Sequence, residues 1–282
     1  MQPRLRINQA SGLLAALLLS LLAFLCPQPI TAGVLEIPGT GACQVLLRGV
    51  ARAFNAKYPD HRVLVPDSAG SSGAIRAVRD DRAILGRVAQ PLKGKEKTYG
   101  LKYLVFARDM VVFATGAKVT VKNLTIAQIL DIFSGKITNW REVGGEPGLI
   151  RLLVRQPGDS SLRVIQEQLP AFRNIAFPVS AKSIHTDPKL LEAVQKYKHS
   201  LCWLTFSALK GARSPVYPLA LDGVAPTPEN ARSHKYKLLE PYALIFKEER
   251  LNELARVFLD FIVSKECQKL MKQYGVIPVD KE

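Results

Sequence analysis

Short apolar stretches of strand type alternate with amphipathic stretches of helix type along most of this chain, and this alternation constrains the fold most strongly. Val34 to Ile37 and His61 to Pro66 are strand patterns, and the intervening Leu46 to Tyr58 places its apolar residues on one helical face. Such alternation is typical of α/β domains with largely parallel sheets. We therefore expect an α/β fold.

The order of the patterns indicates two lobes. A strand pattern from Lys102 to Thr115 is long enough to leave one sheet and approach another. We expect lobe 1 to consist of residues 33–117 and 208–282 and lobe 2 of residues 118–207, each a mostly parallel sheet flanked by helices. About 250 residues are enough for two lobes that each bury a core.

Local signals predict several helix boundaries. Thr125 is suited to cap a helix that runs to Phe133, because a threonine hydroxyl accepts from a free amide at a helix start. A further helix is expected to begin at Ala74. Arg250 to Tyr274 has the pattern of one long amphipathic helix.

Residues 1–32 have the pattern of a signal peptide. Arg4 and Arg6 precede an almost unbroken apolar run from Leu13 to Leu25, and a cleavage site is expected near Ala32. We therefore expect export, with an uncleaved anchor as the alternative. A lipid anchor at Cys26 is disfavoured, because the bulky Leu25 before it suits a lipoprotein cleavage site poorly.

The chain is strongly basic, with 39 Lys and Arg against 24 Asp and Glu and a net charge of +15. Such an excess is compatible with nucleic acid, an anionic surface or small anionic ligands. The positive charges are scattered in ones and twos, except in Lys93 to Lys97, and no basic run is interleaved with aromatic residues. A nucleic-acid groove is therefore not expected, and a generally basic solvated surface is the simplest alternative.

The cysteines and histidines give no sign of a metal site, and no cofactor is expected. Removal of the leader would leave Cys43, Cys202 and Cys267, which allow at most one intramolecular bridge, and a Cys202–Cys267 bridge stays open. Hydrolysis would require a metal cluster or an activated nucleophile, and neither spacing is present. We therefore expect a binding protein rather than an enzyme.

Three short segments, each placed just before a helix pattern, are suited to hold an oxyanion. They are Gly39 to Cys43, Gly70 to Gly73 and Arg155 to Ser161. A helix start offers unpaired amides and a partial positive charge, glycine permits close approach, and arginine adds a bidentate cation. The first two segments belong to lobe 1 and the third to lobe 2, so a shared ligand would lie in the cleft between the lobes.

The stretch Ile132 to Trp140 resembles the hallmark of the phosphate-binding proteins that serve bacterial ABC transporters. The three glycine segments follow the same order, and Tyr274 to Pro278 resembles the closing stretch. The resemblance covers essentially all of the chain after the leader. It implies a two-lobed, hinged periplasmic binding protein of type II that binds a dehydrated tetrahedral oxyanion without catalysis. Its implied partners are inorganic phosphate and an ABC permease in the inner membrane, with the protein as a monomer.

The resemblance also implies a set of ligand-binding residues, which supply backbone amides, hydroxyls and one guanidinium. In this sequence they are Thr40, Gly41, Ala42, Cys43, Ser71, Ser72, Gly73, Arg155, Asp159, Ser160 and Ser161.

This chain departs from the family pattern at a position that affects selectivity. Ala89 stands where the family has a carboxylate that accepts from a protonated phosphate oxygen and repels sulfate. Asp159 introduces a carboxylate into the arginine segment, so it could take over that acceptor role, or it could simply cap the following helix. Cys43-Gln44 also replaces a hydroxyl donor. Another oxyanion, or a sensory or adhesive role for the same scaffold, is the alternative function.

Overall fold

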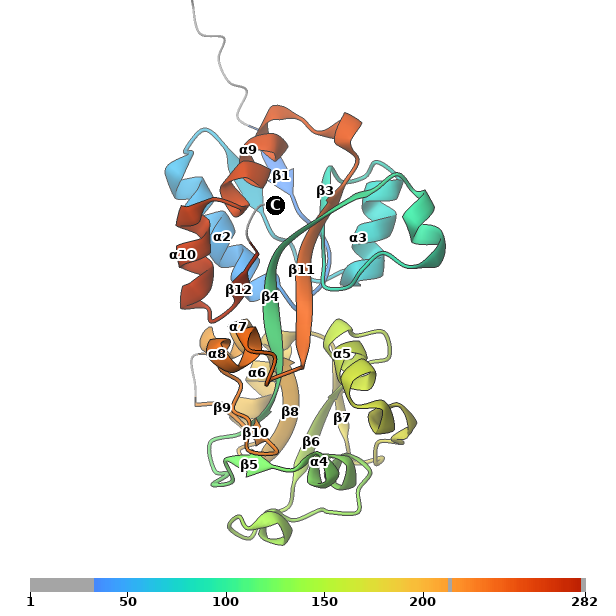
Figure 1. The fold of residues 1–282 in the computed structure, drawn as a ribbon, viewed down its shortest axis with the longest axis vertical. Helices are drawn as coiled ribbons and strands as arrows, with labels where there is room; N and C mark the ends of the chain where they lie inside the picture. Colours follow the sequence, from blue (N-terminus) through green and yellow to red (C-terminus); the bar gives the residue numbers. More distant parts are fainter. Residues whose placement is uncertain (1–32, 213–214, 280–282) are drawn as a thin grey trace, which may run out of the picture.

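Two lobes lie one above the other, and two long strands run between them (Figure 1). The computed structural model of the protein describes residues 33–212 and 215–279, so the expected leader over residues 1–32 lies outside the described residues. The crossing strands are β4 (Lys102–Thr115) and β11 (Leu239–Phe246). The strand expected over Lys102 to Thr115 is confirmed.

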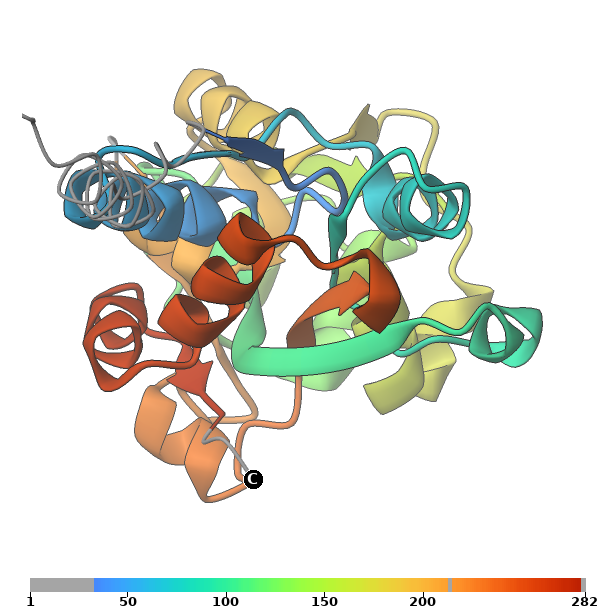
Figure 2. The same cartoon turned by 90° about the horizontal axis from the view of Figure 1, so that it is seen from above.

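The upper lobe packs helices on either side of the crossing strands. Helices α2 and α10 lie on one side and α3 on the other (Figures 1 and 2). Before β4 come β1 (Val34–Glu36), α2 (Gln44–Lys57), β2 (Arg62–Leu64), α3 (Gly70–Arg79), β3 (Leu85–Val88) and the 3-10 helix η1 (Gly94–Thr98). After β11 come η4 (Glu248–Arg250), α9 (Glu253–Ile262), α10 (Lys265–Gln273) and β12 (Ile277–Pro278).

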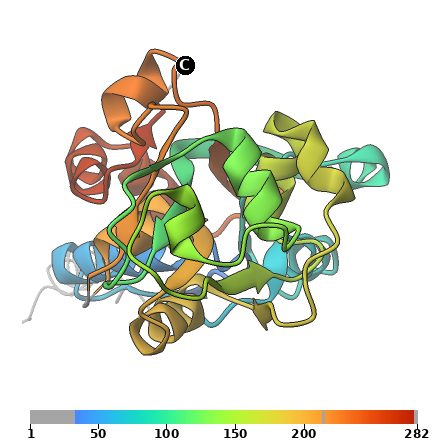
Figure 3. The same ribbon diagram turned by 90° about the horizontal axis from the view of Figure 1, so that it is seen from below.

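The lower lobe is built around a cluster of aromatic side chains, in which Phe113, Phe133 and Trp203 pack ring against ring. Helices α5 and α6 flank its central strands (Figure 3). Its elements are β5 (Asn123–Leu124), α4 (Ile126–Phe133), η2 (Trp140–Val143), β6 (Arg151–Arg155), α5 (Ser160–Gln168), η3 (Pro170–Asn174), β7 (Lys182–Ile184), α6 (Asp187–Lys196), β8 (Ser200–Thr205), α7 (Phe206–Lys210), β9 (Tyr217–Pro218), β10 (Ala220–Leu221) and α8 (Pro228–Arg232).

The main sheet is mixed and continuous through both lobes, with the strand order β3-β11-β4-β8-β6-β7. Strands β8, β6 and β7 are parallel, as are β1 and β2 in a separate pair. The pairs that involve β4 and β11 are antiparallel, because these strands cross between the lobes in opposite directions. The expected α/β class is confirmed, and the parallel order holds away from the crossing strands.

The packing of the two cores supports a return to the upper lobe later than the expected boundary at residue 208. Phe206, Val216, Leu219 and Leu238 pack in the lower core, whereas Tyr242 and the apolar residues after it pack in the upper core. We therefore propose that lobe 2 extends to β11, where the change of core takes place.

Two helix boundaries also differ from the sequence expectations. Helix α3 begins at Gly70 rather than Ala74, so the glycine-serine segment forms its first turn. The region expected as one helix over Arg250 to Tyr274 is split into α9 and α10, because Ser264 has an extended backbone and caps α10. The cap expected at Thr125 is confirmed: its side chain accepts from the amide of Gln128 at 3.1 Å.

Candidate functional site

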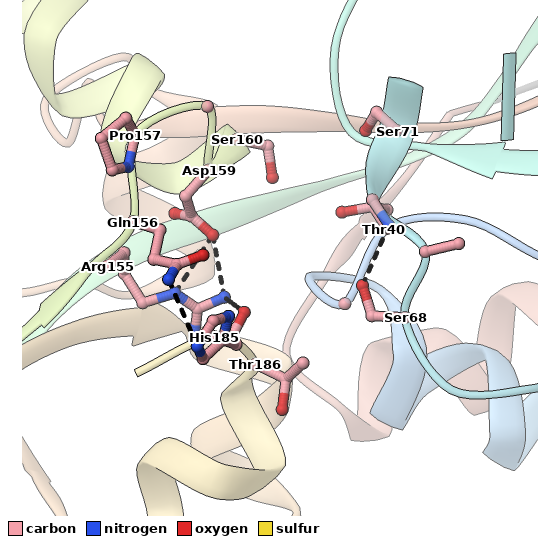
Figure 4. Close-up of a pocket in the computed structure, with 14 residues that line it drawn as sticks. Thr40, Ser68, Ser71, Arg155, Gln156, Pro157, Asp159, Ser160, His185 and Thr186 are labelled. Atoms are coloured by element: carbon pink, nitrogen blue, oxygen red, sulfur yellow. Dashed lines mark hydrogen bonds and ion pairs between the residues drawn. The ribbon is translucent and has the colours of Figure 1, made fainter. Parts of the chain in front are cut away.

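A cavity of about 360 Å³ lies where loops of the two lobes face each other (Figure 4). Its walls come from the segments that lead into four helices, α2 and α3 of the upper lobe and α5 and α6 of the lower lobe. Such segments direct helix N-termini and their free amides toward one space. The lining residues are Thr40, Gly41, Ser68, Ala69, Gly70, Ser71, Arg155, Gln156, Pro157, Gly158, Asp159, Ser160, His185 and Thr186.

Side-chain oxygens accept from backbone amides where α3 and α5 begin, and in α5 this contact is a helix cap. The Ser68 hydroxyl accepts from the amide of Gly70 at 3.2 Å, at the start of α3. The Asp159 carboxylate accepts from the amide of Leu162 at 3.0 Å, at the start of α5. The first-turn amides of Ser71 and Ser160 have no acceptor within their own helices, so they can donate to a ligand.

The upper wall is fixed by the buried side chain of Arg87. Its Nε donates to the Thr40 carbonyl at 2.9 Å and its Nη2 to the Pro66 carbonyl at 2.8 Å. Gly39 has a φ of +147°, and a Cβ there would lie 1.9 Å from the Arg87 carbonyl oxygen, so only glycine suits this approach. Burial lowers the pKa of Arg87. This arginine positions the loop rather than lining the cavity.

The lower wall carries Arg155, whose side chain is only 3% exposed and is held by two carboxylates. Asp159 accepts from Nη2 at 2.8 Å and from Nε at 3.1 Å, and Asp187 accepts from Nη1 at 2.8 Å. Burial alone would lower the pKa of Arg155, but the two carboxylates raise it. Burial raises the pKa of Asp187 to about 6, although Arg155 opposes this shift.

Six of the eleven residues predicted for the site line the pocket: Thr40, Gly41, Ser71, Arg155, Asp159 and Ser160. Asp159 both caps α5 and binds Arg155, so the capping interpretation is confirmed. Its role as an acceptor for a protonated oxyanion stays a prediction.

The other five predicted residues do not line the pocket. The Ala42 amide donates to the Thr40 hydroxyl at 3.3 Å, and Cys43 is fully buried at the start of α2. Burial raises the pKa of the Cys43 thiol to about 12, which outweighs the lowering expected at a helix start. The Ser161 hydroxyl donates to Glu240 at 3.3 Å. Ser72 is exposed, and Ser72 and Gly73 are absent from the lining.

The loop before α6 also contributes to the pocket, although none of its residues is among those predicted from the sequence. His185 and Thr186 line the pocket, and the His185 carbonyl accepts from Arg155 Nη2 at 3.1 Å. The signal was present, because Asp187-Pro188 is a typical helix start that follows the short strand β7. Ser68 and Ala69, just before the second glycine segment, were missed as well.

The remaining sequence expectations concern cysteines, metals and membrane spans. Cys43, Cys202 and Cys267 are buried free thiols, so no Cys202–Cys267 bridge forms. Within residues 33–212 and 215–279, no group of three or more His, Cys, Asp or Glu side chains could hold a metal ion. Over the same ranges, no helix has the length and apolar character needed to cross a membrane.

Comparison with known proteins places the chain in a family. Residues 27–266 match the PBP superfamily domain. The chain is 21% identical to the phosphate-binding protein PstS of Borreliella burgdorferi over 92% of this chain and 94% of that protein. It is 26% identical to PstS of Bacillus subtilis over 88% and 81% of the two chains.

A solved structure is similar over nearly the same range. It is a substrate-binding protein from Clostridium perfringens, assigned to a phosphate ABC transporter and solved with bound phosphate. It is 31% identical, with a TM-score of 0.78, over 88% of this chain and 100% of that chain. The chain therefore belongs to the PBP superfamily, within which it is similar to the phosphate-binding proteins of ABC transporters.

Proposed function

We propose that this protein captures inorganic phosphate in the pocket between its lobes and delivers it to an ABC permease of the inner membrane. The observation that carries the proposal is the convergence of four helix-leading segments and the Arg155 guanidinium on one cavity. Amides, hydroxyls and one guanidinium are the donors that replace the hydration shell of an oxyanion. The relatives named above are phosphate-binding proteins, which favours phosphate over the sensory or adhesive alternative.

The size and wall chemistry of the pocket support a small oxyanion. The first turns of α3 and α5 approach from opposite lobes, and each carries a serine that lines the cavity, Ser71 and Ser160. Gly41 lies close to Ser68 and Thr186, since a Cβ on it would lie 3.3 Å from the Ser68 hydroxyl and 3.6 Å from the Thr186 Cβ. The two lobes therefore approach each other closely beside the pocket.

Export and the absence of catalysis form part of the same proposal. The signal-peptide pattern of residues 1–32 and the expected cleavage near Ala32 would place the protein in the periplasm, where a solute-binding protein meets its permease. We propose that the protein works as a monomer and binds without chemical change of its ligand.

Calorimetric titration with phosphate tests the proposal. We expect a dissociation constant in the micromolar range or tighter, and a loss of about 100-fold or more in Arg155→Ala, because that change also leaves Asp159 and Asp187 without their cation. Arg151→Ala is the matched control, since Arg151 lies on the same strand outside the pocket. Circular dichroism checks that both variants fold. Absence of binding heat with phosphate, arsenate and sulfate in the unmodified protein would contradict the proposal.

A further inference from the structure

The carbonyl of Ala42 is held by a side chain from a crossing strand. Tyr242 of β11 places its hydroxyl oxygen 2.9 Å from this carbonyl oxygen, and both residues are buried. Ala42 directly follows Thr40 and Gly41, which line the pocket. The position of the first pocket loop therefore depends on a contact with the strand that joins the two lobes.

The same tyrosine hydroxyl also contacts a buried carboxyl group. The Tyr242 oxygen lies 2.8 Å from Oδ2 of Asp109, which belongs to the other crossing strand, β4. Each of these oxygen–oxygen contacts is short enough to require a hydrogen between the two atoms. A tyrosine hydroxyl carries one proton, so it cannot donate to Ala42 and to an ionised Asp109 at once.

Both contacts are satisfied when Asp109 carries a proton on Oδ2. The carboxylic acid then donates to Tyr242, and Tyr242 donates to the Ala42 carbonyl. The other contacts of Asp109 are compatible with this arrangement, because Oδ1 accepts from the Met110 amide at 2.7 Å and Oδ2 from the Ser207 amide at 3.1 Å. Burial raises the pKa of Asp109 to about 6, opposed in part by Ser207 and Tyr242.

Thr205 does not replace Tyr242 as the donor to Ala42 while Asp187 is ionised. Its hydroxyl oxygen lies 3.3 Å from the Ala42 carbonyl but 2.9 Å from Oδ2 of Asp187. An ionised Asp187, held by Arg155, takes the single proton of this hydroxyl because a charge-assisted hydrogen bond is stronger. Once Asp187 is protonated below its pKa of about 6, Thr205 can add a longer contact to Ala42, and this contribution is common to every variant that keeps Asp187.

Burial raises the pKa values of the titratable groups near Asp109 and Tyr242, and the pKa of Asp187, raised to about 6, lies in the same range as that of Asp109. Burial raises the pKa of Cys43 at the start of α2 to about 12, and raises the pKa of Tyr242 well above its usual value. Glu240, the direct cross-strand partner of Asp109 on β11, also has its pKa raised well above the usual value by burial. From α7 the contact is the uncharged Ser207. Asp187 contacts Thr205, whereas Asp109 contacts Tyr242, so Asp109 is the group whose ionisation changes the hydrogen bond of the Tyr242 hydroxyl. Asp187 is present in every variant compared below, so its own ionisation is common to all of them.

We propose that Tyr242 is a positioning residue for the first pocket loop, and that protonated Asp109 frees the Tyr242 hydroxyl to hold the Ala42 carbonyl. The inference rests on the proposed function of the pocket. When Asp109 ionises, its carboxylate takes the Tyr242 proton and Ala42 loses its donor. Phosphate affinity therefore falls as pH rises from 5 to 7.5, beyond the change that phosphate's own ionisation causes. One net hydrogen bond corresponds to about three- to tenfold in affinity.

Calorimetric titration with phosphate from pH 5 to 8 tests this dependence in the unmodified protein and in Asp109→Asn and Tyr242→Phe. The ionisation of phosphate is common to all three proteins, so it cancels in the ratio of their dissociation constants. Asparagine can donate to Tyr242 at every pH. We therefore expect the phosphate affinity of the unmodified protein to fall by about three- to tenfold relative to that of Asp109→Asn as the pH rises across this range. Tyr242→Phe should bind phosphate more weakly than the unmodified protein at pH 5, and the two affinities should become similar at pH 7.5.

Tyr236→Phe is the matched control. It removes an equally buried hydroxyl, which donates to the Val111 carbonyl at 2.7 Å and has no contact with Ala42. Its affinity ratio to the unmodified protein should not change with pH. If the affinity ratio of Asp109→Asn to the unmodified protein is also independent of pH, the inference is overturned. Urea unfolding of each variant verifies that it is folded.

Amide hydrogen exchange without ligand separates a failure of this inference from a failure of the proposed function. In residues 39–43, the unmodified protein should lose protection relative to Asp109→Asn as pH rises. If phosphate does not bind at any pH, the proposed function fails. The ratio of the exchange rates of residues 39–43 in the unmodified protein and in Asp109→Asn, called the exchange ratio, then still tests the positioning role. An exchange ratio independent of pH contradicts that role whether or not phosphate binds.

Discussion

Arg155 is the cation of the pocket, yet its charge is more than balanced by its own neighbours. Asp159 and Asp187 both lie 2.8 Å from its guanidinium nitrogens, so the three side chains together carry a net negative charge when all are ionised. Backbone amides at the helix starts must then supply much of the attraction for an anion. A fully ionised ligand meets repulsion from Asp159, whereas an oxyanion that carries a proton can donate to this carboxylate.

Replacement of Asp159 by asparagine tests its contribution to selectivity. Asparagine can keep the cap on the Leu162 amide, but it removes the negative charge that faces the pocket. We expect the ratio of sulfate affinity to phosphate affinity to rise by about tenfold in Asp159→Asn. The substitution removes a contact that repels sulfate and an acceptor for the phosphate proton. Competition calorimetry with the two anions measures this ratio.

The control for this substitution is Asp131→Asn. Asp131 is a more exposed carboxylate of the same lobe, paired with Lys136 at 3.0 Å and outside the pocket. Its replacement should leave the ratio of sulfate to phosphate affinity unaltered. If Asp159→Asn also leaves the ratio unaltered, Asp159 serves only as a helix cap and as the partner of Arg155.

Single residues could be predicted where local chemistry decides their place. Arg155 and Ser71 were found because glycine, serine and arginine stand at strand–helix junctions. Cys43, predicted as a backbone donor, does not line the pocket, and its thiol is completely buried where α2 packs in the upper lobe; its role as a donor stays a prediction. His185 was missed because only the tertiary fold brings β7 and its following loop beside Arg155.

At the scale of elements, strongly periodic segments were predicted well and their junctions less so. β4 was predicted over its full length, because a long apolar run favours a strand that crosses between sheets. The division between α9 and α10 was missed, because apolar spacing continues across it while the backbone at Ser264 is extended. A capping residue inside a helical pattern was the signal that could have shown it.

The Ser264 cap should have a measurable effect on stability. Its side chain accepts from the Cys267 amide at 3.2 Å, and Cys267 packs fully buried in the upper core. We expect Ser264→Ala to lower the free energy of unfolding by about 1 kcal/mol, as measured by urea titration. Ser233→Ala is the control: it alters an exposed serine at the end of α8 that caps no helix start. Equal stability changes in the two variants would contradict a capping role.

At the scale of the whole molecule, the crossing strands place carboxyl groups where the two cores meet. Asp109 and Glu240 lie directly opposite each other on β4 and β11, and both are fully buried. Asp187 is buried at the adjacent start of α6. Sequence patterns could predict two lobes and a crossing strand, but not this gathering, because register between distant strands is set by the whole fold.

These buried groups make the stability of the protein depend on pH with an unusual sign. Burial raises the pKa of Asp109 and of Asp187 to about 6, whereas an aspartate in an unfolded chain ionises near 4. The folded state therefore binds more protons between these values, so its stability falls as pH rises. Exposed Asp80 and Asp81 have lowered pKa values and titrate below this range. We expect the two aspartates to contribute a loss of about 2 to 3 kcal/mol between pH 5 and 7.5, measured by urea titration, and Glu240, whose pKa burial also raises, to add to it. Asp109→Asn should reduce the loss by about 1 to 1.5 kcal/mol, and a gain in stability over the same range would contradict the assignment.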